Sequence, residues 1–167
     1  MNLDFEVLFV KYRSAGILVD TNILLMYVVG LVNRQRIPLF KRTKQFSVEG
    51  FELLDQILRA FHTVVTTPNI LTEVNSLANQ LSAPEKAQFL KLFATTISRL
   101  EETHYASQQL SKLPEFQKFG LTDCSILNLS RNQYLVLTDD FRLSSYLQTK
   151  GIDAVNFTNL RPFIWPT

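Results

Sequence analysis

The sequence predicts an α/β protein in three layers, α/β/α, with a central parallel sheet of about four or five strands. Short apolar runs that end on polar residues alternate along the chain with longer segments of helical period. Such alternation implies right-handed crossovers and a parallel sheet that helices cover on both faces. Hydrophobic residues make up 46% and charged residues 19%, which excludes intrinsic disorder as the main state. The length of 167 residues fits a single domain spanning 1–167.

The first half of the chain contains two of the expected strands and three of the expected helices. Apolar runs predict strands at 17–20, which ends on a carboxylate, and at 62–67. Apolar residues at helical spacing predict helices at 23–32, 48–61 and 68–81, the last of which begins with a proline in its first turn.

Two stretches of the first half lack such a pattern. Residues 1–16 form an N-terminal extension, whose apolar residues fit a helix or a strand equally well. Residues 33–46 (NRQRIPLFKRTKQF) contain a proline and no acid, and we expect a flexible basic insertion loop. The positive charges of that loop are Arg34, Arg36, Lys41, Arg42 and Lys44.

The second half of the chain continues the alternation with two further strands. Thr122 is expected to cap the helix that follows Gly120. In chain order, the expected elements are a helix at 84–100, a partly helical segment at 104–119, a helix from 122 to about 132, a strand at 134–137, a helix at 141–150 and a strand at 152–157.

The apolar run 16–32 is interrupted at Asp20, and its uninterrupted part is far shorter than the roughly 20 residues of a membrane span. Asp4 and Glu6 stand where a signal peptide carries positive charge. Cys124, the single cysteine, excludes an internal disulfide framework and fits a reducing compartment. We therefore expect a soluble, cytoplasmic protein without a membrane partner.

Acidic residues stand at the ends of several expected elements. Asp20 ends the first strand, Asp139 and Asp140 end the third, Asp123 opens a helix, and Glu73 lies one turn into the helix after the second strand. In open parallel α/β sheets, ligands bind beyond the carboxyl ends of the strands. We therefore expect these five acids to converge on one rim.

Clustered carboxylates repel one another unless a cation neutralises them, and a hard ion such as Mg²⁺ or Mn²⁺ prefers oxygen ligands. Taken singly, an acid such as Asp123 at a helix start, or an acidic doublet in a turn, is more often structural. Asp20 differs, because both of its flanks are apolar and a buried charge there needs a reason. The joint placement therefore predicts a metal site.

Polar neighbours support the same site. Asn22 and Thr138 are placed to orient the carboxylates by hydrogen bonds. Thr21 fits two roles equally well, as a site residue or as the cap of the following helix.

Four segments together resemble the PIN domain, over about 17–157 of the chain: VDTNIL, TPNILTEV, LTDCSILNLS and YLVLTDDFRL. The resemblance implies a sheet similar to that of flap-type nucleases and a Mg²⁺- or Mn²⁺-dependent ribonuclease activity. Many small bacterial members are toxins of toxin–antitoxin pairs, which implies an antitoxin or other protein partner. PIN domains often pair through helices, which implies a homodimer.

The resemblance also assigns the acids position by position. Asp20, Glu73, Asp123 and Asp140 match the catalytic and metal-binding quartet; Asp140 is chosen because the family's last acid follows the threonine by two residues. Asp139 is then a bystander or a further metal ligand, and Asn22 matches the polar residue after the first aspartate. The extension at 1–16 and the long insertion at 33–46 depart from the smallest members, so the choice between toxin and housekeeping nuclease stays open.

The expected function is that of an endoribonuclease in which a metal-activated water attacks a phosphodiester of single-stranded or structured RNA. The basic residues of 33–46 would hold the phosphate backbone, with Phe40 and Phe46 stacking on bases. An equally weighted reading makes 33–46 a solvated loop whose aromatic side chains anchor in the core.

The alternative function is a PIN-like module that binds RNA or protein with little catalysis. Phosphoryl transfer onto an aspartate ranks lower, because the position two residues after Asp20 is Asn22. No glycine-rich phosphate loop is present, which disfavours nucleotide hydrolysis of the P-loop kind.

Overall fold

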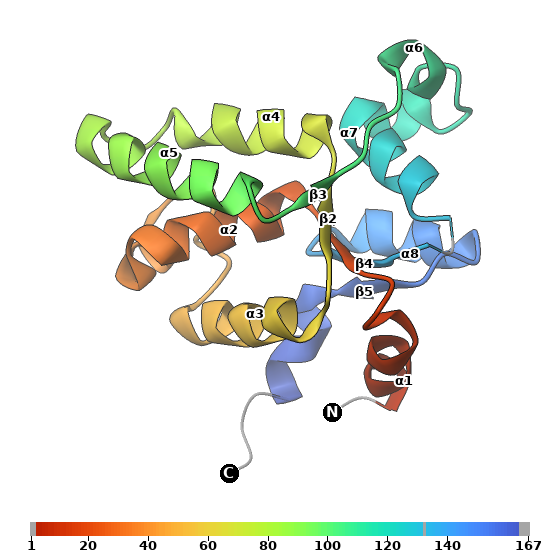
Figure 1. Cartoon of the computed structure of the whole chain (residues 1–167), viewed down its shortest axis with the longest axis horizontal. Coiled ribbons are helices and arrows are strands. Elements are labelled where there is room, and N and C mark those ends of the chain that lie inside the picture. Colours follow the sequence, from red (N-terminus) through yellow and green to blue (C-terminus); the bar gives the residue numbers. More distant parts are fainter. Residues whose placement is uncertain (1–2, 132, 164–167) are drawn as a thin grey trace.

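Five short strands form the centre of the fold, all parallel and in the order β3-β2-β1-β4-β5 (Figure 1). The computed structural model describes residues 3–131 and 133–163. The strands are β1 (Ile17–Val19), β2 (Val64–Thr66), β3 (Glu101–Glu102), β4 (Leu135–Thr138) and β5 (Ala154–Asn156). This sheet, with helices around it, confirms the predicted three-layer α/β/α fold.

The two central strands are apolar throughout because helices cover the sheet. Every residue of β1 and of β4 is buried. Leu18 of β1 is aligned with Val65 of β2 on one side and with Val136 of β4 on the other. Continuous apolar runs of this kind are typical of parallel strands that are covered on both faces.

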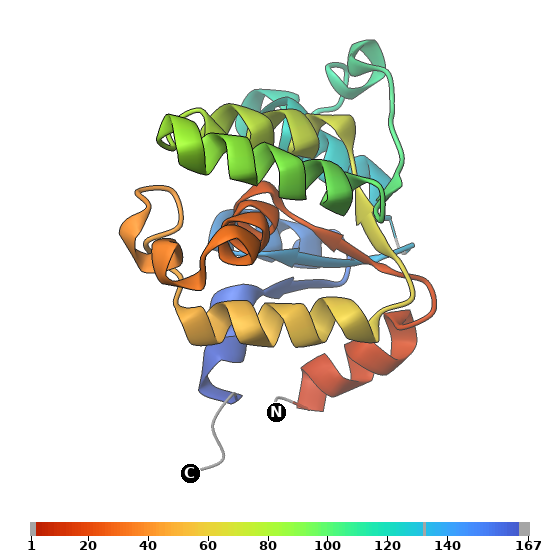
Figure 2. The same ribbon diagram turned by 60° about the vertical axis from the view of Figure 1, so that its left-hand side comes forward.

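Eight α-helices and two 3-10 helices are found in the described residues (Figure 2). α4, α5 and α7 lie together in the upper part of both views and α1 and α3 in the lower part, with strands between them. The α-helices are α1 (Leu3–Tyr12), α2 (Thr21–Val32), α3 (Val48–Ala60), α4 (Pro68–Ala78), α5 (Ala83–Ile97), α6 (Ser107–Leu110), α7 (Phe116–Leu129) and α8 (Phe141–Thr149). The 3-10 helices are η1 (Arg34–Leu39) and η2 (Phe157–Phe163). Within 3–131 and 133–163, no helix is both long and apolar enough to cross a membrane.

Helix starts follow local chemistry, with two corrections to the expected caps. Asp20, and not Thr21, is the N-cap residue of α2. Gly120, where φ is 77°, interrupts the helical backbone within α7 as expected, but Thr122 does not cap the helical segment that follows, because its hydroxyl donates to Glu73. The Asn132 end that we expected for this helix lies outside the described residues.

Two further differences concern segments without a clear periodicity. The described part of the N-terminal extension forms a helix, α1, and the insertion at 33–46 contains the 3-10 helix η1. Strand β3 was not expected, because its two residues are exposed glutamates and carry no apolar signal. Its pairing with β2 identifies it as an edge strand.

Gly30 of α2 is tightly packed, because a Cβ there would collide with the ring of Phe51. We expect Gly30→Ala to lower the free energy of unfolding by about 1–3 kcal/mol, as overpacked cores do. Urea unfolding followed by far-UV circular dichroism measures the change.

Gly50 of α3 provides the matched control, since a Cβ there would lie 3.6 Å from the Ser47 hydroxyl and 3.7 Å from Phe157. Gly50→Ala should leave stability unchanged or raise it by roughly 0.5–1 kcal/mol, because alanine favours the helix. Equal effects of the two alanines would contradict the packing around Gly30.

Candidate metal centre

The site lies at the point where the order of the sheet reverses. From β1 the chain proceeds to β2 on one side, and it later returns to β4 on the other side. Asp20 directly follows β1, and its backbone N–H donates to the Leu137 carbonyl of β4 at 3.0 Å. Asp139 and Asp140 directly follow β4. Two neighbouring strands thus carry acids into the crevice where open α/β sheets bind ligands.

Asp20 is buried, with 7% of its surface exposed. Its Oδ2 accepts a hydrogen bond from the Thr138 hydroxyl at 2.5 Å, and its Oδ1 accepts one from the Thr21 N–H. Burial raises the pKa of Asp20 to about 6, with a smaller contribution from Asp139 and Asp140, although the two hydrogen bonds act in the opposite direction.

Asp123 belongs to α7, yet it lies within the electrostatic range of the strand-end acids. Burial, with smaller contributions from the charges of Asp20, Asp140 and Glu73, raises the pKa of Asp123 to about 7, while Arg142 acts in the opposite direction. The fold therefore brings Asp20, Glu73 and Asp140, from three other parts of the chain, close enough to destabilise the charge of Asp123.

Glu73 of α4 is held by hydroxyl groups from two other helices. The Thr21 hydroxyl of α2 donates to its Oε2 at 2.9 Å, and the Thr122 hydroxyl of α7 donates to its Oε1 at 2.6 Å. Sequence reasoning missed this contact of Thr122. The only sequence signal is that each threonine stands next to an aspartate of the predicted quartet, since Thr21 follows Asp20 and Thr122 precedes Asp123.

Asp139 is held by two amide side chains and points toward the insertion. Asn22 donates to its Oδ1 at 3.1 Å, and Gln45 donates to its Oδ2 at 3.3 Å. Asn22 therefore contacts Asp139 and not Asp20, and the insertion at 33–46 reaches the acidic site through Gln45.

Asp140 serves as the N-cap of α8. Its Oδ1 accepts the N–H groups of Arg142 at 2.7 Å and Leu143 at 3.0 Å. Its own N–H donates to the Thr138 hydroxyl at 3.0 Å, so Thr138 connects Asp140 with Asp20. The capping oxygen is satisfied by the backbone, and Oδ2 faces no donor among the described residues.

Apart from the influence of Arg142 on Asp123, the negative charge of the site has little compensation within the described part of the protein. None of its acids belongs to the ion pairs found there, which all use other carboxylates. Five carboxylates in one region, two of them with raised pKa values, match the oxygen donors and the charge that a hard divalent cation requires. The five acids are Asp20, Glu73, Asp123, Asp139 and Asp140.

The same acids do not form a closed set of ligands. Among residues 3–131 and 133–163, no three His, Cys, Asp or Glu side chains are gathered closely enough to hold one ion as they stand. Mg²⁺ is often bound by only one or two carboxylates together with water and substrate phosphate. The donor chemistry therefore fits such a partly protein-bound ion, and it does not fit an all-protein cage.

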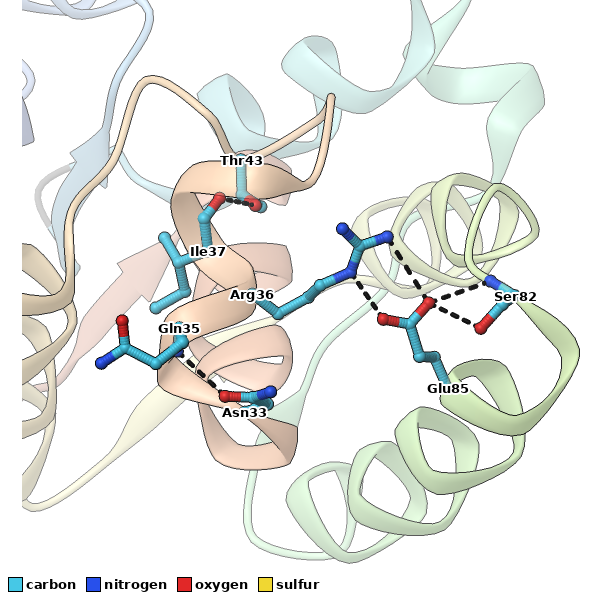
Figure 3. A network of polar contacts seen from close by, with 7 residues as sticks. All are labelled: Asn33, Gln35, Arg36, Ile37, Thr43, Ser82 and Glu85. Atoms are coloured by element: carbon cyan, nitrogen blue, oxygen red, sulfur yellow. Dashed lines mark hydrogen bonds and ion pairs between the residues drawn. The ribbon is translucent and has the colours of Figure 1, made fainter.

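The basic insertion is folded and is bound to its neighbours (Figure 3). Arg36 reaches across to Glu85 of α5, with its Nε 2.6 Å from Oε1, and Glu85 also accepts from Ser82. The Thr43 hydroxyl closes the segment by donating to the Ile37 carbonyl at 2.8 Å. The expected flexible loop is therefore an ordered segment.

Three of the five basic side chains predicted to bind RNA have protein partners. Besides Arg36, Arg34 pairs with Glu52 at 3.0 Å, and Arg42 donates to Gln80 at 3.0 Å. Lys41 and Lys44 are exposed and have no such partner among the described residues.

Phe40 and Phe46 are each 3% exposed, so they are anchors into the core and do not stack on bases. The ring of Phe46 packs edge-on against that of Phe157, with centroids 6.1 Å apart. Of the two readings of 33–46, the one with buried aromatic anchors describes these side chains.

No protein-family model matches the chain, and a search of curated proteins finds no significant match. The resemblance to PIN domains therefore rests on the four sequence segments alone.

The raised pKa values predict how stability depends on pH without metal. The folded-state pKa values of Asp20 and Asp123 lie above the ordinary 3.8. The contribution of these two groups to the free energy of unfolding is therefore fully present below about pH 4, where both are protonated. They lose that contribution as pH rises through about 6 and 7. Asp20→Asn keeps one acceptor oxygen for the capping Thr21 N–H and turns its NH2 group toward the Thr138 hydroxyl, which can accept. It should therefore stabilise the metal-free protein at neutral pH by roughly 1–3 kcal/mol.

Urea unfolding with a chelator at about pH 5 and pH 8 measures this difference, which should shrink at the lower pH. Asp153→Asn is the control of opposite sign. Although burial raises the pKa of Asp153, hydrogen bonds from Lys11 and Tyr12 hold it below its ordinary value. That contribution is present at neutral pH and is lost on acidification, so Asp153→Asn should destabilise. An Asp20→Asn protein that is less stable than the wild type at about pH 8 would refute the assignment.

Proposed function

We propose that the chain is a Mg²⁺- or Mn²⁺-dependent endoribonuclease of the PIN type, with its site at the carboxyl ends of β1 and β4. The observation that carries the proposal is the buried carboxylate of Asp20, which lies among further acids that belong to no ion pair in the described part of the chain. A protein keeps such a destabilising charge where a cation or a reaction uses it.

The proposed metal ligands are Asp20, Asp123 and Asp140. Two further carboxylates, Asp139 and Glu73, add negative charge around them. A bound divalent ion supplies an activated water and offsets negative charge on the phosphoryl group. Thr138 orients Asp20 and the N–H of Asp140 by its hydroxyl.

Glu73 faces the same region from α4 and is kept in place by Thr21 and Thr122. In the proposed reaction it orients the attacking water as a hydrogen-bond acceptor. Each of its oxygens accepts one hydroxyl donor and keeps a second lone pair that can accept a hydrogen bond from the water.

Lys41 and Lys44 are the residues of the insertion best placed to contact a phosphate backbone. They are exposed, and Lys44 precedes Gln45, which contacts Asp139. A cytoplasmic location belongs to the same proposal, since Cys124 is a free buried thiol.

A second candidate is a PIN-like module that binds RNA or protein with little catalysis. The observation in its favour is that no three described acids are gathered closely enough for one ion. Metal binding and RNA cleavage separate the two candidates.

Cleavage of RNA is the first test. With Mn²⁺, the wild type should cut a labelled single-stranded RNA, and Asp20→Asn should reduce the rate at least about 100-fold, as loss of an electrostatic group in a reaction centre does. Gel electrophoresis of the products measures the rate. Asp55→Asn, in an ion pair with Arg59 on α3, is the control and should cut normally. Equal cleavage by the wild type and Asp20→Asn would rule out the site.

Metal binding is the second test, and it does not depend on finding the substrate. Mn²⁺ at about ten times its Kd should raise the Tm of the wild type by a few degrees, because the ion binds only the folded state. Differential scanning calorimetry measures the shift, which Asp20→Asn should largely abolish and Asp55→Asn should keep. No shift at millimolar Mn²⁺ would favour the binding module.

A further inference from the structure

Phe141 is exposed in an unusual place. It is the first residue of α8 and directly follows Asp140, and 74% of its surface is open to solvent. Its ring packs against no other aromatic ring in the described part of the chain. Exposed apolar side chains are common on proteins, so exposure alone decides nothing. What separates Phe141 from the others is the chemistry that surrounds it.

Two cations lie over the Phe119 ring of α7, and one of them, Arg142, directly follows Phe141 in the chain. The guanidinium of Arg142 lies 5.3 Å from the centre of the Phe119 ring, and its Nη2 donates to the Lys118 carbonyl at 3.4 Å. The Lys118 ammonium lies 4.9 Å from the centre of the same ring. Neither cation belongs to the ion pairs of the described residues. Arg142 also faces the acidic site, since it opposes the rise in the pKa of Asp123.

These cations are positioned by aromatic rings and a backbone oxygen and not by acids, so their charge is open to an anionic ligand. We take phosphate as the anion, because the site beside these cations is proposed to cleave phosphodiesters. A guanidinium can donate two parallel hydrogen bonds to phosphate oxygens. A free aromatic face next to a phosphate-binding cation is the combination by which proteins hold single-stranded nucleic acid.

We propose that Phe141 is a specificity-determining residue, a platform on which an unpaired RNA base next to the scissile phosphate stacks, while Arg142 and Lys118 hold the adjoining phosphate. The inference rests on the proposed nuclease function and adds its substrate class. It selects single-stranded RNA over duplex, because a base within a duplex already stacks on both faces and leaves none for Phe141.

An apolar protein surface is the competing ligand, and the surroundings of Phe141 argue against it. The residues on either side of it in the chain are Asp140 and Arg142, which are both exposed and both charged. A single ring between charges offers an apolar partner little area, whereas it suits a nucleotide, which presents a ring and a phosphate together.

The test compares three substitutions of Phe141 in the full chain with Mn²⁺ present. Equilibrium binding of a fluorescent single-stranded RNA and kcat/KM for its cleavage are measured for Phe141→Ala, Phe141→Leu and Phe141→Trp. The alanine and leucine variants should weaken binding roughly 5- to 100-fold, the range of one base–aromatic stack, and the tryptophan variant should bind as the wild type does or more tightly. Unchanged Tm values establish that the variants are folded.

Val10 provides the matched control. It is 76% exposed, as Phe141 nearly is, and it belongs to α1, which carries none of the proposed site residues. Val10→Ala should leave binding unchanged. Arg142→Gln separates charge from stacking: it should reduce the slope of log Kd against log salt by about one, whereas Phe141→Ala should leave that slope unchanged.

The outcomes distinguish this inference from the function on which it rests. If the wild type cleaves RNA and Phe141→Ala or Phe141→Leu binds and cleaves equally well, the stacking platform is overturned and the nuclease remains. Equal affinity of the wild type for duplex and single-stranded RNA would also overturn it. If the wild type neither binds nor cleaves RNA, both proposals fall together.

Discussion

The burial of a single carboxylate at the end of β1 is the constraint around which this region of the protein is organised. Asp20 ends an apolar strand and begins an apolar helix, so its side chain has little access to water. A carboxylate in such a place must find hydrogen-bond donors or become protonated. Thr138, at the end of the neighbouring strand, supplies one donor, and the first N–H of α2 supplies another. The pairing of β1 with β4 sets this geometry, because the two strands end side by side.

The remaining acids increase the free-energy cost of the buried Asp20 charge instead of reducing it. Asp140 and Asp139 bring negative charge from β4, and Asp123 brings it from α7. Hydroxyl and amide groups hold several of these side chains in place: Thr21 and Thr122 hold Glu73, and Asn22 holds Asp139. Such neutral donors orient a carboxylate without cancelling its charge. The result is a negatively charged region whose carboxylates are held in place by hydrogen bonds, an arrangement that fits the proposed function.

Several features could be read from sequence because they depend on neighbours in the chain. The strand that ends at Asp20, the Pro68 start of α4 and the Ser47 cap of α3 all have local signals, and each lies where expected. Strand β3 had no such signal, because an edge strand of two exposed glutamates is defined only by its partner. The basic insertion was mispredicted for a similar reason. Its composition is that of a loop, yet its arginines are bound by Glu52 and Glu85 from other helices and by Gln80 from the turn after α4.

The sequence by itself determined the α/β/α class and the positions of the acids at the ends of elements, since periodicity and element ends are local properties of the chain. Only the tertiary structure decided what each acid contacts. Thr122 lies 49 residues from Glu73 along the chain, and Asn22 lies 117 residues from Asp139, so no spacing rule connects them. It also decided that Phe40 and Phe46 are buried while Phe141 is exposed. The physical reason is that burial and charge compensation depend on which segments pack together, and that is a property of the whole fold.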